Sequence, residues 1–147
     1  MTSYTVKEMN KLDFGSGHNP KDGYMTCDIY GYVDYFFDPI EYAIDCPDNF
    51  FDVIRCHNVI HHIKDIDRLS SEFHRVLKNG GIINITESTK ETYRINYYLD
   101  YLWYRFIIPR YEIWFSPKYR DCREHFTKFK LIEYTVNMEK ELFTFIK

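Results

Sequence analysis

Residues 51–85 read FDVIRCHNVIHHIKDIDRLSSEFHRVLKNGGIINI. The stretch begins with a short apolar run, FDVIRC, which has the composition of a mostly buried strand. Apolar residues then recur at helical spacing over 66–77, with Asp65 as the predicted N-cap and the glycines at 80–81 ending the helix. A second apolar run follows at 82–85. Strand, helix, strand is the pattern of a parallel βαβ unit, so the sequence predicts an α/β fold.

Three further strand-like runs precede this stretch, at residues 11–14, 24–29 and 33–37. The first run ends in Gly15-Ser16-Gly17, where the backbone can turn sharply without a Cβ penalty. Only short connections separate the three runs, whereas a parallel crossover usually needs about a dozen residues or more. We therefore expect the helices after the first two strands to be shortened or absent.

Aromatic residues are unusually frequent, and they gather in the second half of the chain. Phe, Trp and Tyr make up 19% of all residues, and 11 of them lie between residues 93 and 119. The periodicity predicts a helix over 95–108 that ends at Pro109. One apolar stripe of this helix, expected to pack on its own domain, consists of Ile95, Leu99, Leu102 and Phe106. A second stripe, on another side of the helix, consists of Tyr97, Tyr101, Tyr104 and Ile108.

The C-terminal residues predict an antiparallel hairpin. Two strand-like runs at 129–136 and 141–146 are joined by the four residues Asn-Met-Glu-Lys. Such a hairpin can extend an otherwise parallel sheet at its edge.

Length and composition limit the class of protein. The chain has 147 residues, which fits one domain, and its 45% hydrophobic and 28% charged residues exclude a disordered chain. A formal net charge of -3 supplies no general cationic field, so nucleic acid is not favoured as a partner. Residues 1–9 lack a signal-peptide layout, and no apolar run approaches the roughly 20 residues of a membrane helix. We expect a cytoplasmic protein with no membrane partner and with four reduced cysteines.

A glycine turn after the first strand and an acid after the second form a functional pattern. Gly15 and Gly17 let the backbone approach a ligand closely, and Asp28 stands at the end of the next predicted strand. Folds of the α/β class use this layout to hold a nucleoside at the carboxyl ends of their strands, where a carboxylate accepts the ribose hydroxyls. A lone GxG is common in structural turns, so its weight depends on the motifs that follow.

Five motifs occur here in the order in which one enzyme family has them. They are LDFGSG (12–17), GYMTCDI (23–29), PDNFFD (47–52), NVIHHI (58–63) and RVLKNGG (75–81). Together they resemble class I S-adenosylmethionine-dependent methyltransferases, especially the small ones. The resemblance implies a mostly parallel Rossmann-like sheet, S-adenosyl-L-methionine as cofactor, and methyl transfer to an acceptor. It implies one domain over residues 1–147, made of a cofactor-binding half (1–88), an aromatic-rich helical segment (89–127) and a hairpin (128–147).

The resemblance also implies roles for individual residues. Asp28 would bind the ribose hydroxyls, and Gly15 and Gly17 would leave room for the methionine part of the cofactor. Asp13 would lie near the sulfonium and ammonium groups, where a carboxylate is electrostatically favourable, and Asp38 would bind the adenine amino group. The complete predicted set of cofactor-binding residues is Asp13, Gly15, Ser16, Gly17, Asp28, Ile29, Asp38, His57 and Asn58.

The glycine turn departs from the family pattern in one place. Asn19, followed by Pro20, stands where a fuller motif has a third glycine. Asparagine tolerates left-handed backbone, so the turn is expected to survive.

Two alternative functions fit the same pattern. A nicotinamide-dependent oxidoreductase shares the glycine turn and the ribose acid. It is disfavoured because a pyrophosphate needs a helix N-terminus directly after the turn, and that helix is expected to be shortened or absent here. A catalytically inactive cofactor-binding module of the same fold is a further alternative, because the connections are shortened.

Three histidines lie close together at the end of the strand that starts the βαβ unit. A metal site formed by His57, His61, His62 and Cys56 is disfavoured, because strand neighbours point to opposite faces and the spacing is not of zinc type. His57 is the first candidate for a general base, since an imidazole titrates near neutral pH. The acceptor is expected to be a small molecule or a glycan precursor, because the charge balance lacks a basic patch.

The predicted sheet also points to a partner. Its strands, such as 51–56 and 82–85, read as too apolar to leave one face in water, and the shortened connections leave few helices to cover it. We therefore expect a symmetric homodimer whose aromatic helix surfaces supply the missing cover, with an interface above roughly 1,000 Å².

Overall fold

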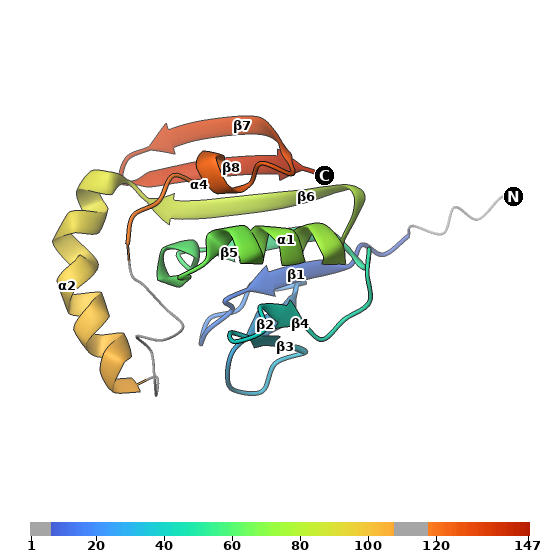
Figure 1. Cartoon of the computed structure of the whole chain (residues 1–147), viewed down its shortest axis with the longest axis horizontal. Coiled ribbons are helices and arrows are strands. Elements are labelled where there is room, and N and C mark those ends of the chain that lie inside the picture. Colours follow the sequence, from blue (N-terminus) through green and yellow to red (C-terminus); the bar gives the residue numbers. More distant parts are fainter. Residues whose placement is uncertain (1–6, 108–117) are drawn as a thin grey trace, which may run out of the picture.

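A computed structural model of the chain describes residues 7–107 and 118–147. Eight strands form one sheet in the order β4-β3-β2-β1-β5-β6-β8-β7 (Figure 1). The strands are β1 (Lys11–Phe14), β2 (Met25–Asp28), β3 (Tyr35–Asp38), β4 (Ala43–Ile44), β5 (Phe51–His57), β6 (Leu77–Ser88), β7 (Lys130–Asn137) and β8 (Lys140–Ile146). The five strands from β3 to β6 in this order pair in parallel, and β4, β8 and β7 pair antiparallel. The predicted α/β class and the C-terminal hairpin are confirmed.

Within the described residues, four helical elements accompany the sheet: η1 (Ile60–His62), α1 (Ile66–Val76), α2 (Lys90–Ile107) and α4 (Cys122–His125). The predicted cap of α1 is present, because Asp65 accepts a hydrogen bond from the N–H of Arg68 at 3.0 Å. The predicted helix end is wrong. Leu77 is already extended and pairs with Phe51, so the glycines at 80–81 lie inside β6 and do not cap α1.

The connections between the first strands are short, as predicted. Between β1 and β3 the structure places turns and no helix. The N–H groups of Gly15 and Ser16 both donate to the carbonyl of Cys27, which folds the first connection back onto β2. In the second connection, Asp34 accepts from the N–H of Thr26 at 2.7 Å. Side-chain and backbone bonds within the turns thus replace the helices that a longer chain would use.

The core lies between the sheet and α1. Phe14 of β1 packs edge-to-face against Phe37 of β3 and Phe73 of α1, each pair with ring centroids 5.0 Å apart. Phe126, just after α4, stacks on Phe145 of β8 at 5.2 Å. Buried aromatic rings of this kind account for part of the aromatic surplus, because each covers a large area of a small core.

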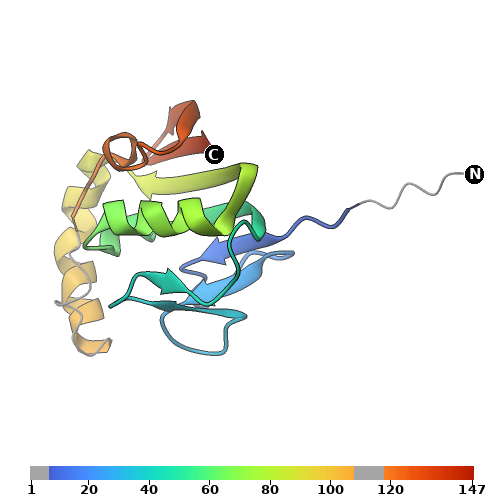
Figure 2. The same cartoon turned by 45° about the vertical axis from the view of Figure 1, so that its right-hand side comes forward.

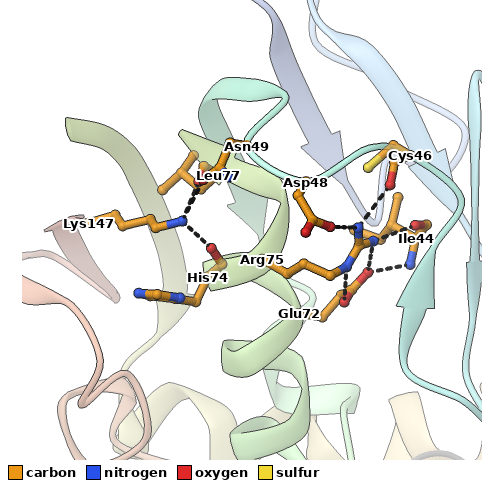
Figure 3. Close-up of polar contacts among 9 residues, drawn as sticks. All are labelled: Ile44, Cys46, Asp48, Asn49, Glu72, His74, Arg75, Leu77 and Lys147. Atoms are coloured by element: carbon orange, nitrogen blue, oxygen red, sulfur yellow. Dashed lines mark hydrogen bonds and ion pairs between the residues drawn. The ribbon is translucent and has the colours of Figure 1, made fainter. Parts of the chain in front are cut away.

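An ion-pair network joins α1 to the β4 region (Figure 3). Arg75 donates to both carboxylate oxygens of Glu72 and to the carbonyls of Ile44 and Cys46. Glu72 in turn accepts from the N–H of Ile44 at 2.8 Å. The guanidinium fork therefore pairs bidentately with Glu72 and also satisfies the backbone of a strand only two residues long.

The second face of the sheet is open in the part of the chain that the structure describes. Figures 1 and 2 show α1 and α4 on the same side of the sheet, with neither helix on the other side. Residues that alternate with the core positions point to the open face, and they include Phe36, which is 49% exposed, Arg55 and the exposed Asn84. The prediction that these strands are too apolar for water is therefore wrong in part, because polar residues alternate with the apolar ones.

Helix α2 lies beside the carboxyl ends of the parallel strands and does not cover a face of the sheet (Figures 1 and 2). Leu99 and Phe106 are 69% and 87% exposed. The prediction that their stripe packs on its own domain is therefore wrong for these two residues, because α2 leaves the sheet at the end of β6 and runs past it. Leu102 of the same stripe is half-buried, and the side chain of Ile95 lies outside the described residues. Of the second stripe, the Tyr97, Tyr101 and Tyr104 side chains and all of Ile108 lie outside the described residues. Among the described helices, none is long and apolar enough to cross a membrane.

Candidate functional site at the carboxyl edge of the sheet

The predicted site residues follow four neighbouring parallel strands. The turn at 15–17 follows β1, Asp28 ends β2, Asp38 ends β3, and His57 ends β5. Because these strands are adjacent and parallel, their carboxyl ends meet at one edge of the sheet. The topology therefore brings the predicted residues together.

Both glycines of the turn have positive φ, but their surroundings differ. Gly15 has φ +70°, and a Cβ atom there would lie 2.3 Å from Cγ2 of Val59. Gly17 has φ +54°, and a Cβ atom there would meet nothing within 4 Å. Gly15 is therefore required both by backbone conformation and by close packing on the loop after β5. Gly17 borders open space, where a ligand can approach the backbone.

Asp28 joins the glycine turn to the end of β2. Its Oδ2 accepts from the N–H of Gly17 at 2.9 Å, and its Oδ1 accepts from the N–H of Ile29 at 2.7 Å. An ionised carboxylate has about four acceptor positions, so these two bonds leave acceptor capacity on a partly exposed group. The geometry suits a carboxylate that holds the turn and also accepts two ligand hydroxyls.

The resemblance implies that Asp13 lies near the charged groups of the cofactor, but in the structure both of its carboxylate oxygens have partners within the chain. Its side chain is buried, with Oδ1 2.7 Å from Nη1 of Arg55 and Oδ2 accepting the N–H of Lys21 at 2.8 Å. Each oxygen is thus bonded within the chain. Asp13 anchors the end of the glycine-containing connection to β5, and through that bond it supports the turn.

Asp38 caps the chain that leaves β3. Its Oδ1 accepts from the N–H groups of Ile40 and Glu41 at 2.8 and 3.1 Å. The half-buried carboxylate therefore fixes the loop that follows it at the same edge of the sheet.

His57 and Asn58 end β5 with different exposure and partners. His57 is exposed as a residue, although its ring is partly shielded from water. This partial burial, together with the positive charges of Arg55 and Lys140, lowers the pKa of His57 below the usual value. Asn58 has φ +53°, donates its N–H to the carbonyl of Thr86 at 2.8 Å, and accepts from the Lys140 ammonium at 2.8 Å. The His57 ring is thus favoured in its neutral form at pH 7, while the Asn58 side chain is held by β8.

Glu87, near the end of β6, holds the loop after β5 and was not anticipated from the sequence. Its Oε1 accepts from the N–H groups of Val59 and Ile60 at 2.9 and 2.7 Å, and its Oε2 lies 2.6 Å from Nδ1 of His61. The side chain is buried, with 6% of the residue exposed. Because Val59 packs on Gly15, this buried carboxylate positions the loop against the glycine turn. The only sequence signal is an acid at the end of an apolar strand.

The histidine pair in this loop is part of the packing. The rings of His61 and His62 lie 3.9 Å apart, and burial lowers the pKa of His62 well below its usual value. Within residues 7–107 and 118–147, no group of three or more His, Cys, Asp and Glu side chains is placed to hold a metal ion.

Comparison with known proteins identifies relatives of this fold. Residues 12–85, just over half of the chain, match the family described as "Methyltransferase domain". None of the curated proteins matches the chain by sequence. The matched span contains every residue of the predicted cofactor-binding set.

Solved structures share the architecture at low sequence identity. An S-adenosylmethionine-dependent methyltransferase from Mesorhizobium loti aligns with a TM-score of 0.67 and 10% identity, covering 95% of this chain and 91% of that one. A SAM-dependent methyltransferase from Aquifex aeolicus aligns with a TM-score of 0.63 and 16% identity, covering 95% and 82%. The PH0226 protein from Pyrococcus horikoshii aligns with a TM-score of 0.64 and 16% identity, covering 97% and 84%. At these identities the likeness establishes the fold.

Proposed function

The chain belongs to the class I S-adenosylmethionine-dependent methyltransferases, and from this we propose that it is an active enzyme that methylates a small molecule or a glycan precursor. The cofactor of the family is S-adenosyl-L-methionine, whose sulfonium supplies an activated methyl group. One observation supports binding at the carboxyl edge above the others. Asp28 lies beside the turn at 15–17 with acceptor capacity left over, within the span that matches the family.

The residues at this edge fit the cofactor. The open space beside Gly17 admits a ligand to the backbone, and Asp28 offers acceptors for a ribose diol. Asp38, at the end of β3, lies at the adenine end of the proposed site. Asp13, bonded to Arg55 and Lys21, contributes by holding the turn.

Direct ligand titration tests the proposal against its rivals. We expect calorimetry to show binding of S-adenosylmethionine and S-adenosylhomocysteine and no binding of NAD. Turnover across a panel of small-molecule and glycan acceptors would then separate an active enzyme from an inactive binding module. Binding of NAD alone would overturn the proposal in favour of an oxidoreductase.

Asp28→Asn should weaken S-adenosylhomocysteine binding at least tenfold. The change removes charge-assisted hydrogen bonds worth about 1.5–3 kcal/mol, while the amide oxygen can still accept from a backbone N–H of the turn. Asp34→Asn is the matched control, since Asp34 also accepts a backbone N–H but precedes β3, away from the carboxyl edge. Wild-type affinity in Asp28→Asn would remove this residue from the site.

We also propose that the enzyme works as a homodimer through α2. An exposed apolar stripe, defined by Leu99, Trp103, Phe106 and Ile107, runs along the helix, with exposures between 49% and 87%. Trp103 is midway between Leu99 and Ile107, so antiparallel pairing of two copies about a twofold axis sets Trp103 against its equivalent and Leu99 against Ile107 of the second copy. The stripe is therefore complementary to itself.

Light scattering should give twice the 18.0 kDa mass of one chain at micromolar concentration. Trp103→Glu places a charge at the centre of the stripe, so this variant is expected to be monomeric. Ile132→Glu, at a comparably exposed apolar position on β7, should leave the mass of the dimer unchanged. A monomeric wild-type protein would refute the dimer.

A further inference from the structure

A pocket of about 650 Å³ lies between the loop after β3 and the beginning of α1. Pro39, Ile40 and Ile66 contribute its apolar wall, together with Tyr42. None of its lining residues belongs to the proposed cofactor site, although the pocket starts directly after Asp38. The pocket is thus lined by other residues and adjoins the proposed site at Asp38.

The Tyr42 side of the pocket is held rigidly. Tyr42 has φ +55°, a backbone conformation that is unfavourable for a bulky residue and persists only where its surroundings hold it. Its hydroxyl accepts the N–H of Asp65 at 2.9 Å, and the Arg68 guanidinium lies 4.6 Å from the ring centroid and donates to the carbonyl of Glu41. These contacts fix the ring between the loop and α1 before any ligand arrives.

Cationic side chains outnumber the free acidic groups around this pocket. Lys64, Arg68 and Arg120 line it, in a chain whose formal net charge is -3. Its two acids already have partners, since Asp65 caps α1 through the N–H of Arg68 and Asp67 lies 3.0 Å from Nδ1 of His125. The exposed Lys64 ammonium has no hydrogen-bond or ion-pair partner among the described residues. A cation without a partner beside an apolar wall favours a ligand that carries an anionic group on an apolar body.

We propose that this pocket binds the carboxylate or phosphate group of the methyl acceptor, with its apolar part against Ile40 and Tyr42. The proposal rests on the proposed methyltransferase function, because the adjoining edge is where the cofactor would lie. Lys64 supplies the charge that selects the anion. The pocket thereby narrows the acceptor class to acidic small molecules and phosphorylated precursors.

Binding of simple probes tests the pocket without any methyl transfer. Phenyl phosphate and benzoate should shift the ¹⁵N–¹H resonances of residues 40–42 and 64–68 in the full chain. Benzyl alcohol, which has the ring but no charge, should bind at least about tenfold more weakly, and so should inorganic phosphate, which has the charge but no ring.

Lys64→Gln should weaken phenyl phosphate binding about fivefold or more with unchanged folding, because the residue is exposed. Lys130→Gln makes the same charge change on β7 and should leave the affinity unchanged. Equal binding of benzyl alcohol, shifts confined to other residues, or an unaffected Lys64→Gln variant would each overturn the pocket. If the probes bind as expected but S-adenosylmethionine does not, the proposed function fails and the anion pocket stands.

Discussion

Gly15→Ala should lower the free energy of unfolding by about 2–5 kcal/mol, whereas Gly17→Ala should lower it by only about 1 kcal/mol. Both glycines have positive φ, so both substitutions meet the left-handed backbone cost of about 1–2 kcal/mol, partly offset by the reduced freedom of the unfolded chain. Only Gly15 adds a collision, because its new methyl group would lie 2.3 Å from Cγ2 of Val59. Overpacking of this kind costs about 1–3 kcal/mol more.

Denaturant unfolding of four variants separates the two causes. If the collision matters, Val59→Ala combined with Gly15→Ala should recover part of the loss, and the double-mutant cycle should show a favourable coupling. The backbone cost is not relieved by that change, so the double variant should remain less stable than Val59→Ala alone. Equal losses in Gly15→Ala and Gly17→Ala, with no coupling to Val59, would show that the loop after β5 does not pack on the turn as described.

The sequence predicted the elements whose periodicity or topology is strong. The βαβ unit could be predicted because the apolar residues over 66–76 recur with the period of a helix, and the apolar runs on either side have the length of strands. That the predicted site residues lie together could also be predicted, since residues that follow adjacent parallel strands must meet at one edge of the sheet. No contact distance is needed for that inference.

The elements that were missed have no periodic signal. Strand β4 has two residues and α4 has four, too few to show a pattern. Each is held by contacts from distant segments, β4 by Glu72 and α4 by Asp67. Glu87 bonds to residues 26 to 28 positions away in the sequence. A single acidic residue carries no sequence pattern from which such distant partners could be predicted. For α2 the periodicity predicts the helix, but the surface against which a stripe packs depends on where the helix leaves the sheet.

His57→Ala should reduce turnover by about a hundredfold or more and leave cofactor affinity within a few-fold, if His57 accepts the proton that the acceptor loses. The imidazole is exposed at the carboxyl end of β5, where an acceptor can reach it. Partial burial and the positive charges of Arg55 and Lys140 lower its pKa, so the ring is neutral and able to accept a proton at pH 7. His18→Ala is the control, because His18 is also exposed, on the connection after β1, and has no assigned role.

The lowered pKa of His57 also predicts the direction in which turnover changes with pH. Because burial and the nearby cations lower the pKa of His57, the loss of turnover at acid pH, where the ring becomes protonated, should occur at lower pH than for an ordinary imidazole. An NMR titration of the His57 ring should give the same midpoint without any acceptor present. A ring that titrates at or above the ordinary histidine range would contradict the lowered pKa. Parallel losses of stability and turnover in His57→Ala, or an unchanged rate, would return His57 to a structural role, because a base acts on the rate while the fold and the bound cofactor stay intact.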